Sequence, residues 1–387
     1  MRPRLGTRAR ATALAAATAV ALASVVVVPR YLRAAALVVN ASGIDGWPQQ
    51  LAAWHAAGFR TEEQQIPSRH GALRARLYRP EGRPRRALVL APGVHAGGLD
   101  ELWLVDFAGH LASRRVAVLT VELPDLLRYS ITPRTTDMIE DAAGWLAGSR
   151  GLAHDGGVGI VGISFAGGLC VSAAGRPGLR DRVSFVLSIG GHGNLRRTLR
   201  YLCTGVLADG TRQQPHDYGV AIALLAVADR VVPPAQVKSL RDGILVFLEA
   251  SRLDAVDKTL AAATFDRARA LEREMPEPAA TFMRAVNTRD VAALGSALLP
   301  HLASMAEDPA LSPELSPAPA APVYLLHGAD DDVIPSIESH LLAEYLEGQT
   351  RVELLVTPVM THAGVDRRPG LRDVTRLVAF WAGALEE

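Results

Sequence analysis

The sequence is poor in cysteine, in net charge and in nucleotide-binding glycine motifs. Its two cysteines in 387 residues, Cys170 and Cys203, are too few and too far apart for a disulfide framework or a cysteine-based zinc site. The formal net charge is +1, but the first 33 residues hold six arginines and no acid, so residues 34–387 carry −5. A mildly acidic body argues against nucleic acid as a partner. No segment has the glycine spacing of a P-loop or a dinucleotide-binding turn, which argues against a nucleotide cofactor.

A long uncharged run lies near the N-terminus, from Ala11 to Val28. Its 18 residues are just enough to cross a bilayer as a helix, which takes roughly 17–25 residues. The arginines before it favour a cytoplasmic N-terminus. We therefore expect residues 1–33 to form a membrane anchor, with the rest of the protein outside the cytoplasm. Secretion after cleavage at the A-x-A site Ala21–Ala23 is an alternative, and an alanine-rich arm that never meets a membrane is another.

The body of the chain alternates short apolar runs with helical patterns, after a predicted antiparallel hairpin in the segments FRTEEQQIP and GALRARLYRP. A helix is expected within 34–58. Further strands are expected at 87–93, 116–124, 158–162, 183–191, 322–328 and 351–356, and helices near 101–113, 135–148, from 164, 336–347 and 370–384. Apolar runs alternating with helices are typical of an α/β fold, a mostly parallel sheet covered by helices on both faces.

A long helical segment interrupts this alternation. Residues 194–321 contain three stretches with helical apolar spacing and end in the proline-rich DPALSPELSPAPAAP, which we interpret as a stiff linker. Residues 34–193 and 322–387 are thus the two parts of one core, and 194–321 is a predicted helical cap inserted between them. The cap's apolar composition weakly favours a partly hydrophobic substrate.

The segment VGIVGISFAGG places Ser164 between a predicted strand and a predicted helix. A strand that turns sharply into a helix needs small residues two positions before and after the apex, and here these are Gly162 and Ala166. This is the logic of the nucleophile elbow, G-x-S-x-G, with alanine in place of the second glycine. The alternative for Ser164 is an ordinary helix N-cap.

Partners for a nucleophilic serine follow in the chain. A serine needs a base, and the base needs a carboxylate to orient it. Asp330, Asp331 and Asp332 follow the strand expected at 322–328, and His362 follows the strand expected at 351–356. Because parallel strands present their carboxyl ends at one edge of the sheet, these loops are expected to lie beside Ser164.

The chain therefore resembles the α/β-hydrolase superfamily, near its dienelactone-hydrolase and esterase-like branches, over roughly residues 60–193 and 322–385. The pattern H-G-x-x-D-x-x-x-P of that superfamily falls on His327, Gly328, Asp331 and Pro335. The resemblance implies that Asp331 is the acid of a Ser164–His362–Asp331 triad. It also implies two main-chain donors for an oxyanion, the amides of Phe165 and of Val94. The family often has His-Gly before the second donor, where this chain has Pro92-Gly93, and the change puts the shape of the pocket in doubt.

The predicted function is a serine hydrolase that acts on an ester or a related acyl bond of a small-molecule substrate. An acyl-enzyme chemistry of this kind needs no cofactor and no metal. A peptidase, an amidase or an acyltransferase with the same triad is an alternative. A non-catalytic, membrane-tethered binding module on a hydrolase fold is a further one.

Overall fold

The computed structural model describes residues 27–41, 46–54, 56–149, 151–152, 157–254, 256–302, 306–362 and 370–385. At its centre is an eight-stranded sheet in the order β1-β2-β4-β3-β5-β6-β7-β8. The strands are β1 Phe59–Ile66, β2 Leu73–Pro80, β3 Arg86–Ala91, β4 Val116–Val121, β5 Val158–Ile163, β6 Val183–Ile189, β7 Val323–Gly328 and β8 Val352–Thr357. Strands β1 and β2 pair antiparallel, as do β2 and β4, and the other neighbours are parallel.

The central strands form where the sequence has unbroken apolar runs. Every residue of β4, β5 and β7 is buried, which is expected of parallel strands covered on both faces. Alternate residues of one strand contribute to different cores: Val89 belongs to the core on one face of the sheet, and Leu88 and Leu90 belong to the core on the other. The sheet is thus the shared wall of two hydrophobic layers.

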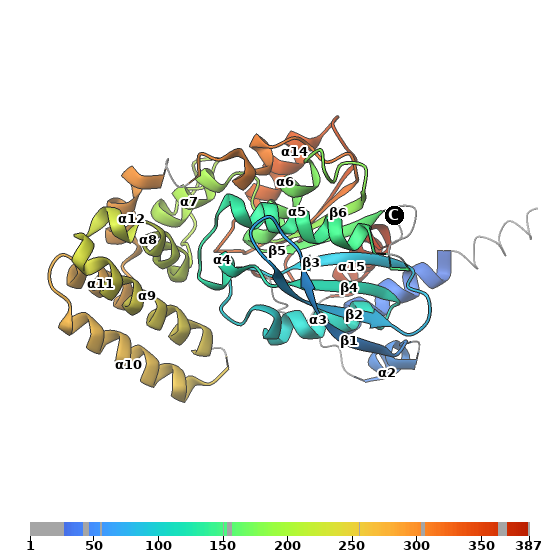
Figure 1. Ribbon diagram of the computed structural model, residues 1–387, viewed down its shortest axis with the longest axis horizontal. Helices are drawn as coiled ribbons and strands as arrows, with labels where there is room; N and C mark the ends of the chain where they lie inside the picture. The colour runs from blue at the N-terminus through green and yellow to red at the C-terminus, as the bar shows by residue number, and fades with distance from the viewer. Residues whose placement is uncertain are drawn as a thin grey trace, which may run out of the picture.

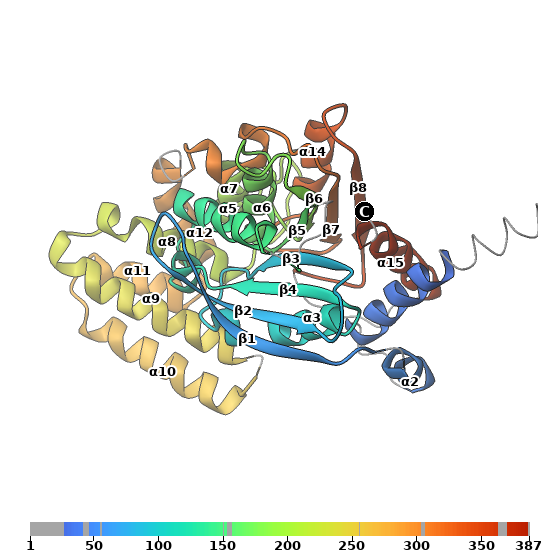
Figure 2. The same ribbon diagram turned by 45° about the vertical axis from the view of Figure 1, so that its right-hand side comes forward.

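Helices cover both faces of the sheet (Figure 2). Helices α5, α6 and α14 contribute to the first core, and α3, α15 and residues 27–41 contribute to the second. Their bounds are α3 Leu102–Ala112, α5 Pro133–Ala147, α6 Phe165–Ala174, α14 Ile337–Leu346 and α15 Leu371–Ala384. The predicted alternation of strands and helices is confirmed. This strand order, with helices on both faces, is the α/β-hydrolase fold, as the resemblance implied.

The helical insertion between β6 and β7 lies at one end of the molecule (Figure 1). It contains α7 Leu195–Thr204, α8 Asp217–Val231, α9 Pro234–Asp254, α10 Lys258–Glu274, α11 Ala279–Asn287 and α12 Val291–Leu298. Helices α8, α9 and α12 lie where the sequence shows the three stretches of helical apolar spacing within residues 194–321. The exact domain boundaries stay predictions.

The proline-rich exit from the insertion, which we interpreted as a stiff linker, packs against the core. It folds into two short 3₁₀ turns, η3 Pro309–Leu311 and η4 Pro313–Leu315, with Ser312 buried between them. A Cβ atom placed on Gly175 at the end of α6 would lie 1.7 Å from the carbonyl oxygen of Pro317, so the segment presses directly on the core. The proline ring fixes φ, and here the prolines shape a segment that packs against α6.

The N-terminal region differs in detail from its prediction. The helix expected within 34–58 is divided into a helix over residues 27–41 and the helix α2 Trp47–Trp54. Gly46, directly before α2, has a φ of 90°, which a continuous helix cannot contain, and the fixed φ of proline at Pro48 suits the first turn of a helix. Most of the predicted membrane segment, residues 1–26, lies outside the described residues. Among the described helices, none has both the length and the apolar character needed to span a bilayer.

Candidate active site

Ser164 stands at a strained turn between β5 and α6. Its φ of 57° and ψ of −135° are rare for a residue with a side chain. The amide of Ser164 donates a hydrogen bond of 2.7 Å to the carbonyl of Ile189, at the end of the neighbouring β6. Its side chain makes no capping hydrogen bond to α6, so the simple N-cap interpretation does not describe it. Strain of this kind persists where the surrounding fold holds a side chain in an exact position.

The small residues around Ser164 have a steric reason. A Cβ atom on Gly162 would lie 2.4 Å from the carbonyl oxygen of Ala166 and 2.7 Å from the Sγ of Cys170. No side chain fits in that space. Only glycine at position 162 therefore allows the sharp turn from β5 into α6. Cys170 is buried and its pKa is raised by burial, so it acts as a small apolar filler.

His362 lies directly against the serine. The Nε2 atom of His362 is 2.7 Å from the Oγ of Ser164, although 198 positions separate the two residues. His362 follows β8, and Ser164 follows β5, so the two loops leave the same edge of the sheet. This distance agrees with the expectation that Ser164 and His362 lie side by side.

Asp331 is the third member of the group and is fully buried. Its Oδ2 lies 2.8 Å from the Nδ1 of His362, and its Oδ1 accepts hydrogen bonds of 2.9 Å from the amides of Val333 and Ile334. Burial alone would raise the pKa of Asp331, but its electrostatic interaction and hydrogen bonds with His362 and His327 outweigh this effect, so the pKa lies well below its ordinary value. An ionised carboxylate only accepts hydrogen bonds. The proton of His362 is therefore on Nδ1, and Nε2 is free to accept the proton of the serine.

The three adjacent aspartates have different surroundings, which the sequence alone did not distinguish. Asp330 is exposed, and Asp332 is half-buried with a pKa raised by burial. Only Asp331 faces His362. The buried His327 fixes this loop, because its Nε2 lies 2.7 Å from the carbonyl of Ile334 and 3.3 Å from the Oδ2 of Asp331.

The two expected oxyanion donors lie on either side of Ser164. Phe165 is the first residue of α6, and Val94 follows β3 in the adjacent loop. That loop comes very close: a Cβ atom on Gly93 would be 3.2 Å from the Cβ of Ser164. Within the described residues, neither the Phe165 amide nor the Val94 amide donates a hydrogen bond. Both therefore suit the role of binding a developing negative charge.

A cavity of about 500 Å³ opens above Ser164 and His362. This volume is within the usual range for small-molecule sites. The core contributes Val94, His95, Trp103, Tyr129 and Ile163 to its walls, among others, and the insertion contributes His216, Tyr218, Leu248, Ser251 and Arg252. The wall is mostly apolar, with a few polar groups, and burial lowers the pKa of His95.

Sequence reasoning expected the insertion to bear on the substrate but did not identify Tyr129 or the individual residues of the insertion that line the cavity. Tyr129 is buried, has a φ of 57°, and lies in the cavity wall together with Val94. Tyr218 and Arg252 reach the cavity from α8 and α9. The positive φ of Tyr129 has no sequence signal, and the positions of Tyr218 and Arg252 depend on how the insertion packs.

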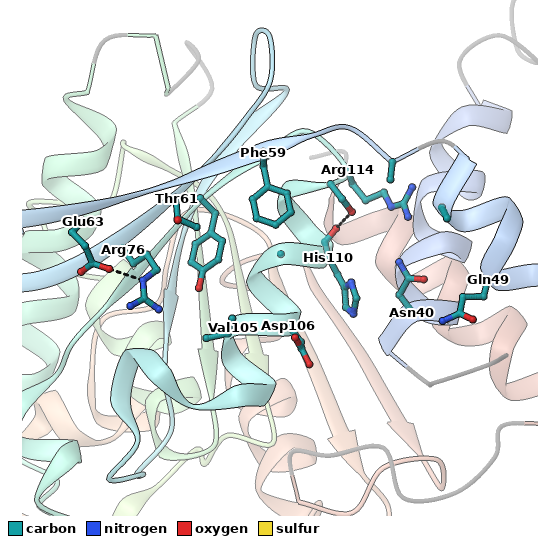
Figure 3. A pocket seen from close by; sticks show the side chains of 15 residues that line it. Asn40, Gln49, Phe59, Thr61, Glu63, Arg76, Val105, Asp106, His110 and Arg114 are labelled. Carbon is teal, nitrogen blue, oxygen red and sulfur yellow. Dashed lines mark hydrogen bonds and ion pairs between the residues drawn. The ribbon is translucent and has the colours of Figure 1, made fainter.

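A second cavity, of about 760 Å³, is separate from this site (Figure 3). It lies between the β1–β2 hairpin, α3 and the N-terminal helices, and is lined by residues such as Phe59, His110 and Arg114. In the part of the chain that the structure describes, no three His, Cys, Asp or Glu side chains are grouped to hold a metal ion.

Comparison with known proteins gives likenesses in structure only. No protein-family model matches the chain, and no curated protein matches it. An esterase from Pyrobaculum calidifontis is 19% identical, with a TM-score of 0.46, over 84% of each chain. Est1E from Butyrivibrio proteoclasticus is 15% identical, with a TM-score of 0.44, over 84% of this chain and 99% of that one. An acylaminoacyl peptidase from Pyrococcus horikoshii is 14% identical, with a TM-score of 0.43, over 82% of this chain and 40% of that one.

Proposed function

We propose that this protein is a serine hydrolase that cleaves a carboxylic ester or a related acyl bond. The observation that carries the proposal is the continuous hydrogen-bonded line from Ser164 Oγ through His362 to the buried Asp331, with distances of 2.7 and 2.8 Å. Ser164 and His362 line a cavity whose volume suits a small molecule. Each contact is within the hydrogen-bond reach that proton transfer requires.

The chemistry follows from the proton positions. Nε2 of His362 takes the proton of Ser164 as Oγ attacks the acyl carbon, and Asp331 stabilises the imidazolium that forms. The amides of Phe165 and Val94 bind the oxyanion of the tetrahedral intermediate. Its collapse expels the alcohol, which receives the proton from His362 and leaves an acyl group on Ser164. A water molecule, activated by His362 in the same way, releases the acid and restores the serine.

The cavity supports a small and partly apolar acyl substrate. Trp103, Leu104 and Leu248 give apolar walls, while Ser251 and Arg252 place polar groups in the part formed by the insertion. Apolar walls with a few polar groups bind a ligand by burial and orient it by hydrogen bonds.

The test is hydrolysis of p-nitrophenyl esters of increasing acyl length by the full chain and by Ser164→Ala. We expect turnover by the wild type and a loss of roughly 10⁶-fold in the variant, as in comparable triads. Ser172→Ala is the matched control, because Ser172 is also a buried serine but lies within α6. Folded wild-type protein without activity on any of these esters would contradict the proposal. Anilides with the same acyl groups test for an amidase, and we expect them to react more slowly than the esters.

A further inference from the structure

Helix α2 carries large apolar side chains that are exposed to solvent. Trp47 is 72% exposed, Trp54 is 80% exposed and Leu51 is 48% exposed. They recur at i, i+4 and i+7 and therefore form one stripe along the helix. The helix, WPQQLAAW, has no charged residue. Exposed tryptophans in such an arrangement are unusual for a surface that faces only water.

Other positions of α2 face the body of the protein. Ala52 is the only buried residue of the helix. Gln49 and Ala53 line the 760 Å³ cavity instead, and Figure 3 shows Gln49 beside Asn40 and near His110 and Arg114. The helix is held at its C-terminal end, where Arg114 donates a 2.8 Å hydrogen bond to the carbonyl of Ala52. The stripe thus adds nothing to the hydrophobic core.

The start of the helix over residues 27–41 carries further exposed apolar side chains. Its first two turns expose Val27, Val28, Tyr31 and Leu32, whereas Leu37 and Val38 further along are buried in the core. Figures 1 and 2 both show this helix beside α2, at the end of the molecule opposite the helical insertion. We call Val27, Val28, Tyr31, Leu32, Trp47, Leu51 and Trp54 together the N-terminal apolar patch.

We infer that the N-terminal apolar patch binds a lipid bilayer, with α2 lying in the headgroup region. The sequence favours this occupant over a second copy of the chain, because the uncharged run from Ala11 ends within the patch, at Val28. Arg30, two residues further on, donates a 2.7 Å hydrogen bond to the carbonyl of Ala382 and ties the start of the helix over residues 27–41 to α15. Tryptophan and tyrosine are the residues enriched at the membrane–water interface, where an apolar ring with a polar atom is stable.

The experiment places the full chain in phosphatidylcholine–phosphatidylglycerol vesicles and measures quenching of tryptophan fluorescence by brominated lipids. We expect stronger quenching by lipids brominated near the headgroup than by lipids brominated near the end of the acyl chain, because α2 lies at the interface. In the double variant Trp47→Phe, Trp54→Phe, the quenching falls at least about two-fold, because the interfacial tryptophans have been removed. Trp145→Phe is the matched control, because Trp145 lies on α5, within the body, and its loss leaves the quenching in place.

Two results would overturn the inference. One is quenching that is absent from the wild type or unchanged in the double variant. The other is a dimer in sedimentation that dissociates in Trp47→Gln, Leu51→Gln but not in Val256→Gln, Leu260→Gln, since the patch would then bind a second copy. Val256 and Leu260 are similarly exposed residues of the insertion.

Discussion

The sheet and the helical insertion differ in how strongly burial constrains them. All six residues of β5 are buried, whereas in the 17-residue helix α10 only Ala261 and Ala268 are. Ser164, Asp331 and His362 all come from loops at the sheet's edge, but a large part of the cavity wall comes from α8 and α9. The edge of the sheet thus holds the proposed reacting groups, and the insertion contributes to the space proposed for the substrate. We expect changes in the two regions to alter different kinetic parameters.

The largest effect is expected from a change at the sheet's edge that keeps the shape of the site. In Asp331→Asn the amide cannot hold the Nδ1 proton of His362 as a carboxylate does, so the wrong tautomer is favoured. We expect kcat to fall by roughly 10⁴-fold with little change in KM. Steady-state kinetics on a p-nitrophenyl ester measures this, and Asp330→Asn is the control, since Asp330 is exposed. Equal losses in both variants would contradict the role of Asp331.

The wild-type pH profile tests the same carboxylate. Because the pKa of Asp331 is lowered in the folded protein, the group stays ionised at and somewhat below its ordinary value of about 4. No loss of activity above about pH 4 should therefore come from protonation of Asp331. Titration of the Asp331 carboxyl group with a midpoint above about pH 4, measured by 13C NMR of the labelled side chain, would contradict this assignment.

A smaller and different effect is expected from the insertion. Leu248→Ala enlarges the cavity from the side of α9, so kcat/KM shifts toward longer acyl chains by about 10-fold, while turnover of a short ester changes little. Leu240→Ala is the matched control, since Leu240 is an equally buried leucine of α9 that is absent from the cavity wall. Both variants should lose about 2–5 kcal/mol of stability. The same change in acyl preference in both would show that the insertion acts only through stability.

The smallest effect concerns the pH dependence of stability in the insertion. A hydrogen bond to Asp217 raises the pKa of His216 above its ordinary value. Protonated His216 therefore stabilises the folded state below about pH 6.5, and this contribution is lost as the pH rises through the raised pKa. The side chain of His216 is 42% exposed, so we expect less than about 1 kcal/mol. Chemical denaturation of wild type and His216→Gln should give a larger difference at pH 5.5 than at pH 8.5, and the reverse order would contradict this.

The sequence predicted the parts of the fold whose signals are local. Runs such as VGIVGI give buried strands, and the small residues flanking Ser164 give the sharp turn. The position of β4 between β2 and β3 has no local signal, because pairing between strands depends on contacts distant in the chain. Helix α10 was missed because most of its residues are exposed and its apolar face is narrow. The cavity wall from α8 and α9 was missed because helix packing places Tyr218 and Arg252 there.

Covalent labelling with a fluorophosphonate probe, followed by peptide mass spectrometry, tests the central claim most directly. The reagent reacts with a serine made nucleophilic by a neighbouring base. We expect one modification, on the peptide containing Ser164, which is lost in Ser164→Ala and greatly slowed in His362→Ala. Folded wild-type protein that remains unlabelled, or that is labelled at another serine, would contradict the claim that Ser164, His362 and Asp331 act together as a catalytic unit.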